Sequence, residues 1–348
     1  MFPGIAVARE LSRRFRDSEI LFVTGRRKME SKILSREGFQ QVSISVEGLK
    51  GRGWARMIGG MMKLPLGFFQ SLYLMRRFSP HVVLGVGGYS SGPVCLAARV
   101  LGIPSAIHEQ NSFPGLTNRI LCRIVDRVFI SFEESRRHFS GGDVFFTGNP
   151  IREEILEAES ADVVGGAGFT ILVMGGSQGA RAINKAFLGA LRILKARGRR
   201  PQIIHQTGEA DYEMVLKGYR ELGIEGEIRV FIEDMGSAYR RADMVVSRAG
   251  ATTVSELAAL GKPSILVPYP YAANRHQETN AQVLAGVGAG YVVLEKELSA
   301  EGLADLLTGM MENREKLGIM GRNARKVGVR RASRTIVDLL LDMARRRQ

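Results

Sequence analysis

The chain has 348 residues, 45% of them hydrophobic and 24% charged, and this length exceeds what one hydrophobic core usually supports, so we expect two domains of about 150 to 200 residues each. The two cysteines both lie in apolar stretches, which argues against a disulfide framework or a metal cluster and favours a cytosolic compartment. No uncharged apolar run reaches the roughly 18 residues of a membrane span, and the first residues lack the basic region and apolar core of a signal peptide. We therefore expect neither a transmembrane nor an exported protein.

The 49 Lys and Arg residues outnumber the 35 Asp and Glu residues and give a formal net charge of +14. Such an excess indicates an anionic partner, either nucleic acid, an anionic lipid surface or a phosphorylated substrate, although a solvated basic surface would give the same count. The basic residues are spread over helices and both termini, and neither a zinc finger nor the aromatic motif of an RNA-binding sheet occurs. We therefore expect no nucleic-acid partner.

Short apolar runs rich in β-branched residues recur along the chain, each followed by a glycine-containing turn and a stretch with helical spacing, which predicts βα units around parallel sheets. An acidic and then glycine-rich segment, residues 150–168, separates two series of such runs. The fold class is therefore α/β, with two doubly wound Rossmann-like domains, residues 1–152 and 168–330, and a last helix, residues 331–348, expected to pack back on the first domain. The predicted strands are 19–24, 41–46, 81–86, 104–108, 127–131, 143–147, 169–174, 202–206, 228–232, 243–247, 264–267 and 290–294.

The chain opens on a helix rather than on a strand. Pro3 stands near its first turn, and Ile5, Val7, Ala8 and Leu11 form its apolar face. A doubly wound sheet normally begins with a central strand whose following turn supplies phosphate-binding amides. We therefore expect the middle of the first sheet to be unpaired and that phosphate site to be missing.

A glycine turn between a predicted strand and a predicted helix, GGSQGA, is the first candidate ligand site. Ser177 stands where a helix N-cap would fall, and glycines allow close approach of a ligand to the backbone. The N–H groups of this turn and the positive end of the helix dipole suit a diphosphate, a reading that the strand-to-helix context favours over a plain tight turn. The turn residues are Gly176, Ser177, Gln178, Gly179 and Ala180.

The segment VVSRAGATTVSEL, residues 245–257, combines a strand end, a glycine turn and a helix expected to begin at Thr252 or Thr253. Glu256 near the helix start could accept hydrogen bonds from the two hydroxyls of a ribose. It could equally close a capping box with Thr253 or offset the helix dipole, and the residue alone leaves these readings open.

Polar residues follow predicted strands in both halves. In the second half, the loop and helix start of residues 267–282 offer Gln277 and Asn280 to sugar hydroxyls, although polar loop residues are usually just solvated. In the first half, the turn GGYSSGP and the motif HEQN would turn His108, Glu109 and Asn111 toward a cleft. His108 or Glu109 could be a general base there, or a structural hydrogen-bonding group. Glycine turns in both halves, facing a shared cleft, suit two phosphorylated ligands.

Residues 49–78 alternate apolar and aromatic side chains, including Trp54, Phe68 and Phe69, with six basic ones. The segment is too short and too charged to span a membrane. It predicts either an amphipathic helix in an anionic lipid interface or an ordinary core helix with basic ends.

Eight motifs in this order and at these spacings resemble the MurG family, the UDP-N-acetylglucosamine:lipid I transferases of peptidoglycan synthesis, which are GT-B glycosyltransferases of family 28. The motifs are GGYSSGP, IHEQN, GLTNR, TGNPIR, GGSQGARAIN, FIEDM, SRAGATTVSEL and VPYPYAANRHQETNA. The resemblance covers nearly the whole chain. It implies two domains that face a cleft, with the UDP-sugar bound by the second.

The resemblance also implies roles for matching residues. Ile232 would lie by its backbone near the uracil, Ser177 and its glycine turn at the diphosphate, and Gln277 at the N-acetylglucosamine hydroxyls. Asn111 and Arg152 would reach the nucleotide sugar, while Tyr89 and His108 would face the lipid-linked acceptor. Glu256 would bind the ribose, and the wall around the nucleotide would consist of Ala251, Thr252, Thr253, Val254, Ser255 and Glu256.

The implied reaction moves N-acetylglucosamine, with inversion, onto the 4-hydroxyl of the muramic acid of lipid I, so that lipid II forms and UDP leaves. Because no metal-ligand set is visible and helix dipoles and backbone amides can stabilise a departing diphosphate, we expect a mechanism without metal or other cofactor. The family is peripheral at the cytoplasmic leaflet, which favours the lipid-interface reading of residues 49–78 and an anionic membrane surface as a partner.

The sequence departs from the family's pattern in lacking its first strand and GGTGGH loop, whose histidine is the usual candidate for the general base. Either Glu109 or His108 takes that role, or the chain is catalytically impaired, or the true start lies upstream of Met1. We favour the last, because losing a central strand would cost more than the roughly 5 to 15 kcal/mol of a domain's stability. A related GT-B transferase or epimerase with another UDP-sugar, and a membrane-bound scaffold that only binds UDP-sugar, are the competing functions.

Overall fold

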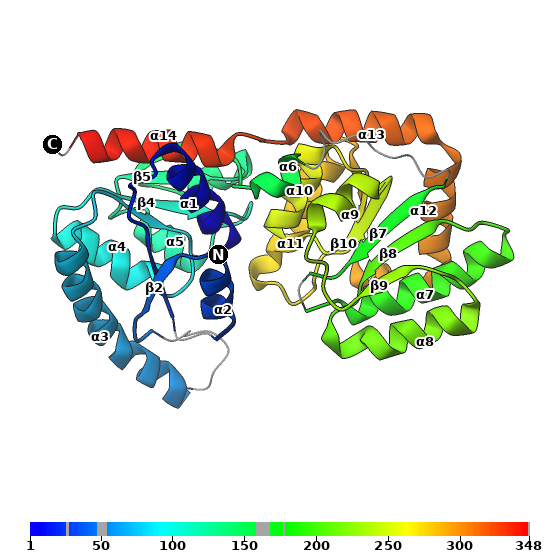
Figure 1. The fold of residues 1–348 in the computed structure, drawn as a ribbon, viewed down its shortest axis with the longest axis horizontal. Coiled ribbons are helices and arrows are strands. Elements are labelled where there is room, and N and C mark those ends of the chain that lie inside the picture. The colour runs from blue at the N-terminus through cyan, green and yellow to red at the C-terminus, as the bar shows by residue number, and fades with distance from the viewer. Residues whose placement is uncertain (26–27, 47–53, 158–167, 177, 347–348) are drawn as a thin grey trace. The chain divides into compact units, whose positions relative to one another are not determined.

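The computed structural model describes residues 1–25, 28–46, 54–157, 168–176 and 178–346. It consists of two units, each built around parallel strands with helices on both faces (Figure 1). Unit 1 comprises Met1–Arg152 and Arg331–Gln348, and unit 2 comprises Glu153–Arg330. The predicted pair of Rossmann-like α/β domains is confirmed.

Unit 1 alternates helices and strands from its first residues. The predicted opening helix is confirmed as α1, and the C-terminal helix α14 packs against it. The helices are α1 (Phe2–Arg14), α2 (Lys28–Arg36), α3 (Trp54–Phe78), α4 (Ser91–Val100), α5 (Leu116–Leu121) and α14 (Ala332–Arg345), with a 3-10 helix over Glu133–His138. The strands are β1 (Leu21–Thr24), β2 (Gln40–Ser43), β3 (Val83–Gly85), β4 (Ser105–Glu109), β5 (Arg127–Ile130) and β6 (Asp143–Phe146).

The strands of unit 1 form two separate parallel sheets. β1 pairs with β2, while β3, β4, β5 and β6 form a four-stranded sheet, and among the described residues no hydrogen-bonded ladder joins β1 to β3. The expected unpaired middle of the first sheet is confirmed. The side chains of the four-stranded sheet alternate between two layers, as the period of a strand requires: Ala106 packs toward α1 and α14, and Ile107 toward α4 and α5.

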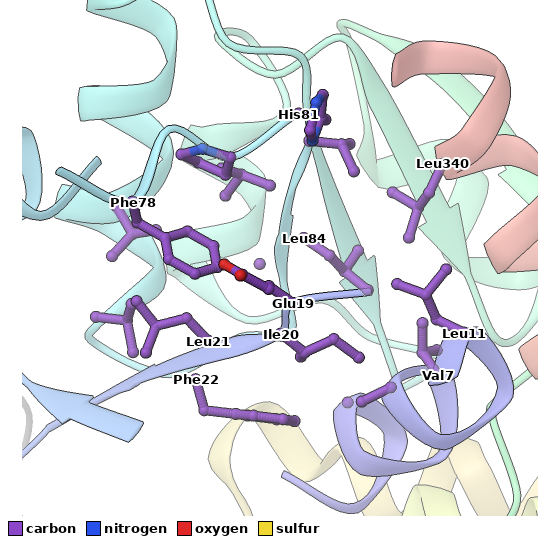
Figure 2. A pocket seen from close by; sticks show the side chains of 18 of the residues that line it. Val7, Leu11, Glu19, Ile20, Leu21, Phe22, Phe78, His81, Leu84 and Leu340 are labelled. Carbon is purple, nitrogen blue, oxygen red and sulfur yellow. The ribbon is translucent and has the colours of Figure 1, made fainter. Parts of the chain in front are cut away.

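A cavity of about 780 Å³ lies between β1 and β3. Figure 2 shows Leu21 and Phe22 of β1 on one side of it and Leu84 of β3 on another, with Val7 and Leu11 of α1 nearby. Helices α3 and α14 also contribute lining residues. The core of unit 1 is therefore divided where a doubly wound sheet is normally continuous.

Unit 2 has one continuous six-stranded parallel sheet in the order β12-β11-β10-β7-β8-β9. The strands are β7 (Thr170–Met174), β8 (Gln202–Gln206), β9 (Glu227–Arg229), β10 (Met244–Ser247), β11 (Ser264–Leu266) and β12 (Gly290–Val292). The helices are α6 (Glu153–Glu157), α7 (Arg181–Ala196), α8 (Tyr212–Leu222), α9 (Met235–Arg241), α10 (Ala251–Leu260), α11 (His276–Ala285), α12 (Ala300–Glu312) and α13 (Arg314–Val327), with 3-10 helices over Glu209–Asp211, Ala273–Arg275 and Glu295–Glu297.

The order of these strands reverses at β7. The chain passes from β7 outward through β8 and β9, and then returns to the other side of β7 as β10. In open α/β sheets, ligands bind outside the carboxyl ends of the strands at such a switch point. The loops after β7 and β10 are therefore the first place to look for a ligand site in unit 2.

Candidate functional site

The glycine turn after β7 packs against the turn after β8. A Cβ atom on Gly179, whose φ is +77°, would lie 2.0 Å from the Thr207 carbonyl oxygen, so only glycine allows this approach. Gly176, with a φ of +85°, has open space around its Cα and is exposed, as is Gln178. The turn is thus supported from within unit 2 and open on its other side, as a backbone anion site requires.

The helix after this turn begins later than predicted. Helix α7 starts at Arg181 with Ala180 as its N-cap, so the prediction of an N-cap at Ser177 is wrong. Ser177 itself lies outside the described residues.

Glu256 lies in a buried polar contact at the switch point. Helix α10 begins at Ala251 with Gly250 as its N-cap, so the predicted helix start at Thr252 or Thr253 is wrong. Because Thr253 is not the N-cap, it cannot form the capping box with Glu256. The Glu256 side chain is buried, and its Oε2 accepts a hydrogen bond of 2.9 Å from the hydroxyl of Tyr239. The same hydroxyl lies 3.9 Å from Sδ of Met174, the last residue of β7. The carboxylate thus lies near the end of the central strand.

The residues in the first turns of α10, which precede Glu256, differ in burial. Thr252 and Thr253 are half-buried, whereas Ala251, Val254 and Ser255 are buried. The two threonine side chains are therefore the more accessible part of this predicted nucleotide wall.

Ile232 lies in the loop after β9, because β9 ends at Arg229 and the predicted strand over residues 228–232 is three residues too long at its end. Its backbone N–H donates a hydrogen bond of 2.8 Å to Oε1 of Gln206. The residue is buried. The backbone of Ile232 was expected near a uracil, and its N–H is engaged by the Gln206 side chain.

Gln277 and Asn280 on α11 differ from each other in exposure. Gln277 is half-buried, and its Oε1 accepts a hydrogen bond of 2.9 Å from the backbone N–H of Tyr269. Asn280 is completely buried and donates to the carbonyl oxygen of Ala249 at 3.3 Å. The expectation that Asn280 binds sugar hydroxyls is therefore wrong, because its side chain braces the turn after β10.

Arg248 is a site residue that the sequence reasoning missed. Its guanidinium donates to the carbonyl oxygens of Val267 and Pro268, both at 3.2 Å, and forms an ion pair with Glu295. It also lies 5.3 Å from the centroid of the Tyr269 ring. Arg248 therefore holds the loop whose Tyr269 N–H orients Gln277. The sequence could have indicated Arg248, because it directly follows a predicted strand at the edge of the sheet where ligands bind.

His108 in unit 1 is buried and has both ring nitrogens engaged. Its Nε2 donates to the carbonyl oxygen of Gly148 at 3.1 Å, and its Nδ1 accepts from the Gln110 side chain at 3.0 Å. Burial lowers the pKa of His108 to about 4, so the ring is neutral at pH 7. This burial contradicts the expectation that His108 faces a cleft, either as a general base or as a contact to the lipid-linked acceptor substrate.

Glu109 is buried as well, and both carboxylate oxygens accept hydrogen bonds. Its Oε1 accepts from the backbone and side chain of Asn111 at 2.9 and 3.1 Å, and its Oε2 accepts from Gly115 N at 3.0 Å and from the Asn118 side chain at 2.9 Å. Glu109 therefore organises the loop after β4 rather than presenting a base, which corrects the second catalytic prediction. The half-buried Asn111 is held in place by it.

The structure brings two predicted motifs of unit 1 together. The Gln110 side chain donates to the carbonyl oxygen of Val86 at 3.1 Å, which links HEQN to the GGYSSGP turn. Tyr89 in that turn is 38% exposed, so its ring is accessible to a ligand. Arg152 is half-buried, with its guanidinium 5.2 Å from the ring centroid of Phe2 on α1.

Among the described residues, no group of three or more His, Cys, Asp and Glu side chains has the geometry of a metal site. Within the same residues, no helix has both the length and the apolar character needed to cross a membrane.

Family models match most of the chain. The model of the glycosyltransferase family 28 N-terminal domain matches residues 1–130, and that of the C-terminal domain matches residues 170–336. The chain belongs to glycosyltransferase family 28. The two matched ranges fall in unit 1 and, for the most part, in unit 2, so this family 28 member carries both halves of the family's architecture.

Relatives within the family extend over nearly the full length. A protein of Syntrophus aciditrophicus (strain SB), named UDP-N-acetylglucosamine--N-acetylmuramyl-(pentapeptide) pyrophosphoryl-undecaprenol N-acetylglucosamine transferase, is 44% identical over 99% of this chain and 96% of its own. The crystal structure of Acinetobacter baumannii MurG is 31% identical, covers 98% of this chain and 95% of that one, and superposes with a TM-score of 0.79. A UDP-GlcNAc 2-epimerase from Neisseria meningitidis, 15% identical over 98% of this chain and 96% of that one, with a TM-score of 0.69, shares the fold.

Proposed function

We propose that this family 28 chain transfers N-acetylglucosamine from UDP-N-acetylglucosamine to the muramic acid of lipid I, with inversion, to give lipid II and UDP. The observation that carries the proposal is the 44% identity, over nearly the full length of both chains, to a protein named for this reaction. The arrangement of unit 2 supports it, because a glycine turn, a buried carboxylate and a half-buried amide follow three strands of one sheet at the same edge.

Unit 2 would bind the donor. The N–H groups of Gly176 and Gln178, with Ser177 between them, would receive the diphosphate, Gly179 would close the turn by donating to the Gly176 carbonyl oxygen, and Glu256 would bind the ribose hydroxyls. Oriented N–H groups at this position would also stabilise the negative charge that develops on the departing UDP. Ile232 would lie against the uracil, and the residues of α10 from Ala251 to Ser255 would complete the wall.

Gln277 would bind the hydroxyls of the transferred sugar. Its Oε1 is held by the Tyr269 N–H, and among the described residues its side-chain nitrogen has no protein partner, so that N–H2 group is available to donate. The loop that orients it is held by Arg248 through two carbonyl oxygens.

Unit 1 would supply acceptor and nucleotide-sugar contacts through Tyr89, Asn111 and Arg152. We assign no general base to His108 or Glu109, because both are buried and their polar atoms are engaged within unit 1. These two residues would instead fix the loop that carries Asn111.

We also propose that unit 1 binds an anionic membrane surface at the cytoplasmic leaflet. Leu66, Phe69 and Tyr73, which lie at helical spacing on α3, are 50%, 64% and 68% exposed, and Arg76 and Arg77 follow in the last turn. Exposed aromatic and aliphatic side chains beside basic ones suit a lipid interface. Sedimentation with vesicles that contain anionic lipid should fall when Phe69 and Tyr73 are both changed to Ser, and an unchanged bound fraction would refute this surface.

The test of the main proposal is transfer of radiolabelled N-acetylglucosamine to a lipid I analogue. The assay should be run with this chain and with a form that has a GGTGGH-containing segment joined ahead of Met1. We expect labelled lipid II in at least one form, and label in the second form alone would assign the base to that segment. Absence of transfer in both forms, with the protein folded, would count against the proposal.

A chain that binds UDP-N-acetylglucosamine without transferring it is the second candidate. The divided sheet of unit 1 and the burial of His108 and Glu109 favour it, while the undamaged motifs of unit 2 are compatible with both candidates. UDP binding without transfer in either form would select this second function.

A further inference from the structure

Gln206, the last residue of β8, connects two segments that lie on opposite sides of it. Its side-chain nitrogen donates to the carbonyl oxygen of Gly176 at 2.9 Å, in the turn after β7. Its Oε1 accepts from the N–H of Ile232 at 2.8 Å, in the loop after β9. Because β8 lies between β7 and β9 in the sheet, one side chain reaches both neighbouring loops from the middle strand.

The geometry leaves one orientation of this amide. A carbonyl oxygen must face an N–H2 group and a backbone N–H must face an oxygen, so turning the amide around would break both bonds. Gln206 is buried, and buried hydrogen bonds of this kind are costly to leave unmade. Gln206 therefore links Gly176 and Ile232 through one side chain.

The two connected segments are the ones to which we assign the diphosphate and the uracil. We propose that Gln206 is a positioning residue, which holds the diphosphate turn and the base-binding loop at the spacing of an intact UDP group. This inference rests on the proposed function of unit 2. It adds a residue that touches neither end of the nucleotide and acts through Gly176 and Ile232.

The proposal predicts that a change at Gln206 weakens the binding of UDP as a whole more than the binding of uridine or pyrophosphate alone. In Gln206→Met, a side chain of similar length without donor or acceptor, the side-chain link between the two loops is lost, while the backbone hydrogen bonds from Thr207 and Gly208 to Arg229 and Val230 remain. The affinity for UDP should fall about tenfold, equivalent to about 1.4 kcal/mol. The affinities for uridine alone and for pyrophosphate alone should change by less than about twofold, because each subsite can still adjust to its own ligand.

Titration calorimetry and competition against UDP measure these affinities. The matched control is Gln202→Met, because Gln202 is a glutamine at the opposite, amino end of the same strand and is exposed there. The control should bind all three ligands as the unchanged protein does. Equal losses for UDP, uridine and pyrophosphate in Gln206→Met would indicate a general structural role, and unchanged UDP affinity would remove the role altogether.

Hydrogen exchange provides a test that does not depend on the ligand. The Ile232 amide should exchange faster in Gln206→Met but stay protected in Gln206→Glu, whose carboxylate still accepts from it and cannot donate to Gly176. An Ile232 amide that remains equally protected in Gln206→Met would overturn the connection itself. If the unchanged protein binds no UDP while the exchange data agree with expectation, the proposed function fails and the connection between the loops stands.

Discussion

Both units are built on parallel strands, but the sheet is continuous in unit 2 and interrupted in unit 1. In unit 2, β7 has hydrogen-bonded neighbours on both sides, β8 and β10, and all five of its residues are buried. In unit 1, β1 has β2 on one side and the cavity on the other, and three of its four residues are only half-buried. A continuous hydrogen-bonded ladder fixes the carboxyl ends of neighbouring strands relative to each other. Where the ladder is interrupted, only side-chain packing fixes their relative position.

The consequence is visible in how each unit holds its loops. In unit 2, Glu256 and Gln206 are buried groups that reach from one strand end or helix to the next. In unit 1, the turn after β3 is tied to the loop after β4 by Gln110, within the four-stranded sheet, and no such bond among the described residues joins it to β1. The donor site is therefore expected to be the more rigid part of the molecule.

Hydrogen exchange should give the largest difference between the units. Amides of β7 should exchange at least about 100-fold more slowly than those of β1, because β1 can open by breaking one ladder and exposing little apolar surface. Exchange measured by mass spectrometry on peptides that cover residues 19–25 and 169–176 checks this. Equal protection of the two strands would mean that the cavity does not weaken β1.

The next effect concerns nucleotide binding by unit 2. Glu256→Ala should weaken UDP binding by about 2 kcal/mol, roughly 30-fold, because it removes a buried charged acceptor and leaves the Tyr239 hydroxyl without this partner. Affinity for the lipid-linked acceptor should stay the same. Tyr239→Phe, which keeps the carboxylate, is the matched control and should cost less. An unchanged nucleotide affinity in Glu256→Ala would remove this residue from the ribose role.

Acid should destabilise both units through one buried histidine in each. Burial lowers the pKa of His108 to about 4 and that of His205 to about 3, so both are neutral when folded and take up a proton near pH 6.5 when unfolded. The unfolded state therefore binds more protons below pH 6.5. Stability is fully present above this pH and is lost by up to about 1.4 kcal/mol per pH unit per histidine as the pH falls toward 4.

Urea unfolding at several pH values between 4 and 7.5 measures this slope. In His205→Gln, a non-titrating residue that still offers a donor and an acceptor to Asn184 and Tyr219, the slope should fall by about half. A slope identical to that of the unchanged protein would show that other groups cause the acid sensitivity.

The sequence predicted most of the strands because parallel strands buried on both faces appear as continuous apolar runs. Helix starts were less predictable. A serine in a glycine turn was taken for the N-cap, yet α7 begins at Arg181, because Gly176 and Gly179 adopt positive φ angles that lengthen the turn. Such backbone conformations depend on packing against Thr207, which is distant in sequence.

Site residues were predictable where their position at a strand end mattered and unpredictable where burial mattered. His108 and Glu109 follow the pattern of exposed catalytic groups, but the loop after β4 folds over them and satisfies their polar atoms. Gln206, Tyr239 and Arg248 were missed for the opposite reason. Their contribution comes from partners on other strands and helices, which only the assembled sheet brings into reach.

The smallest effect tests the cavity directly, by placing the same substitution in both units. Ala8 on α1 lines the cavity and is 5% exposed, whereas Ala190 on α7 is fully buried in the closely packed core of unit 2. Ala8→Leu should stabilise unit 1 by about 1 kcal/mol, because the added carbons enter existing space and gain apolar contacts. Ala190→Leu should destabilise unit 2 by about 1 kcal/mol or more, because Ala190 is fully buried in the core and the added carbons would have to displace neighbouring side chains.

Thermal unfolding followed by calorimetry distinguishes the two outcomes, since about 1 kcal/mol shifts the Tm of a domain of this size by roughly 2 to 4 °C. Ala8→Val, which adds fewer carbons, should raise the Tm by less than Ala8→Leu and so provides a graded control. A lower Tm for both Leu variants would mean that the space beside α1 closes in solution. Tm shifts of opposite sign in the two Leu variants would mean that the interruption between β1 and β3 persists. Any segment able to pair with both strand edges there would then be stabilised by apolar contacts on both faces of the sheet.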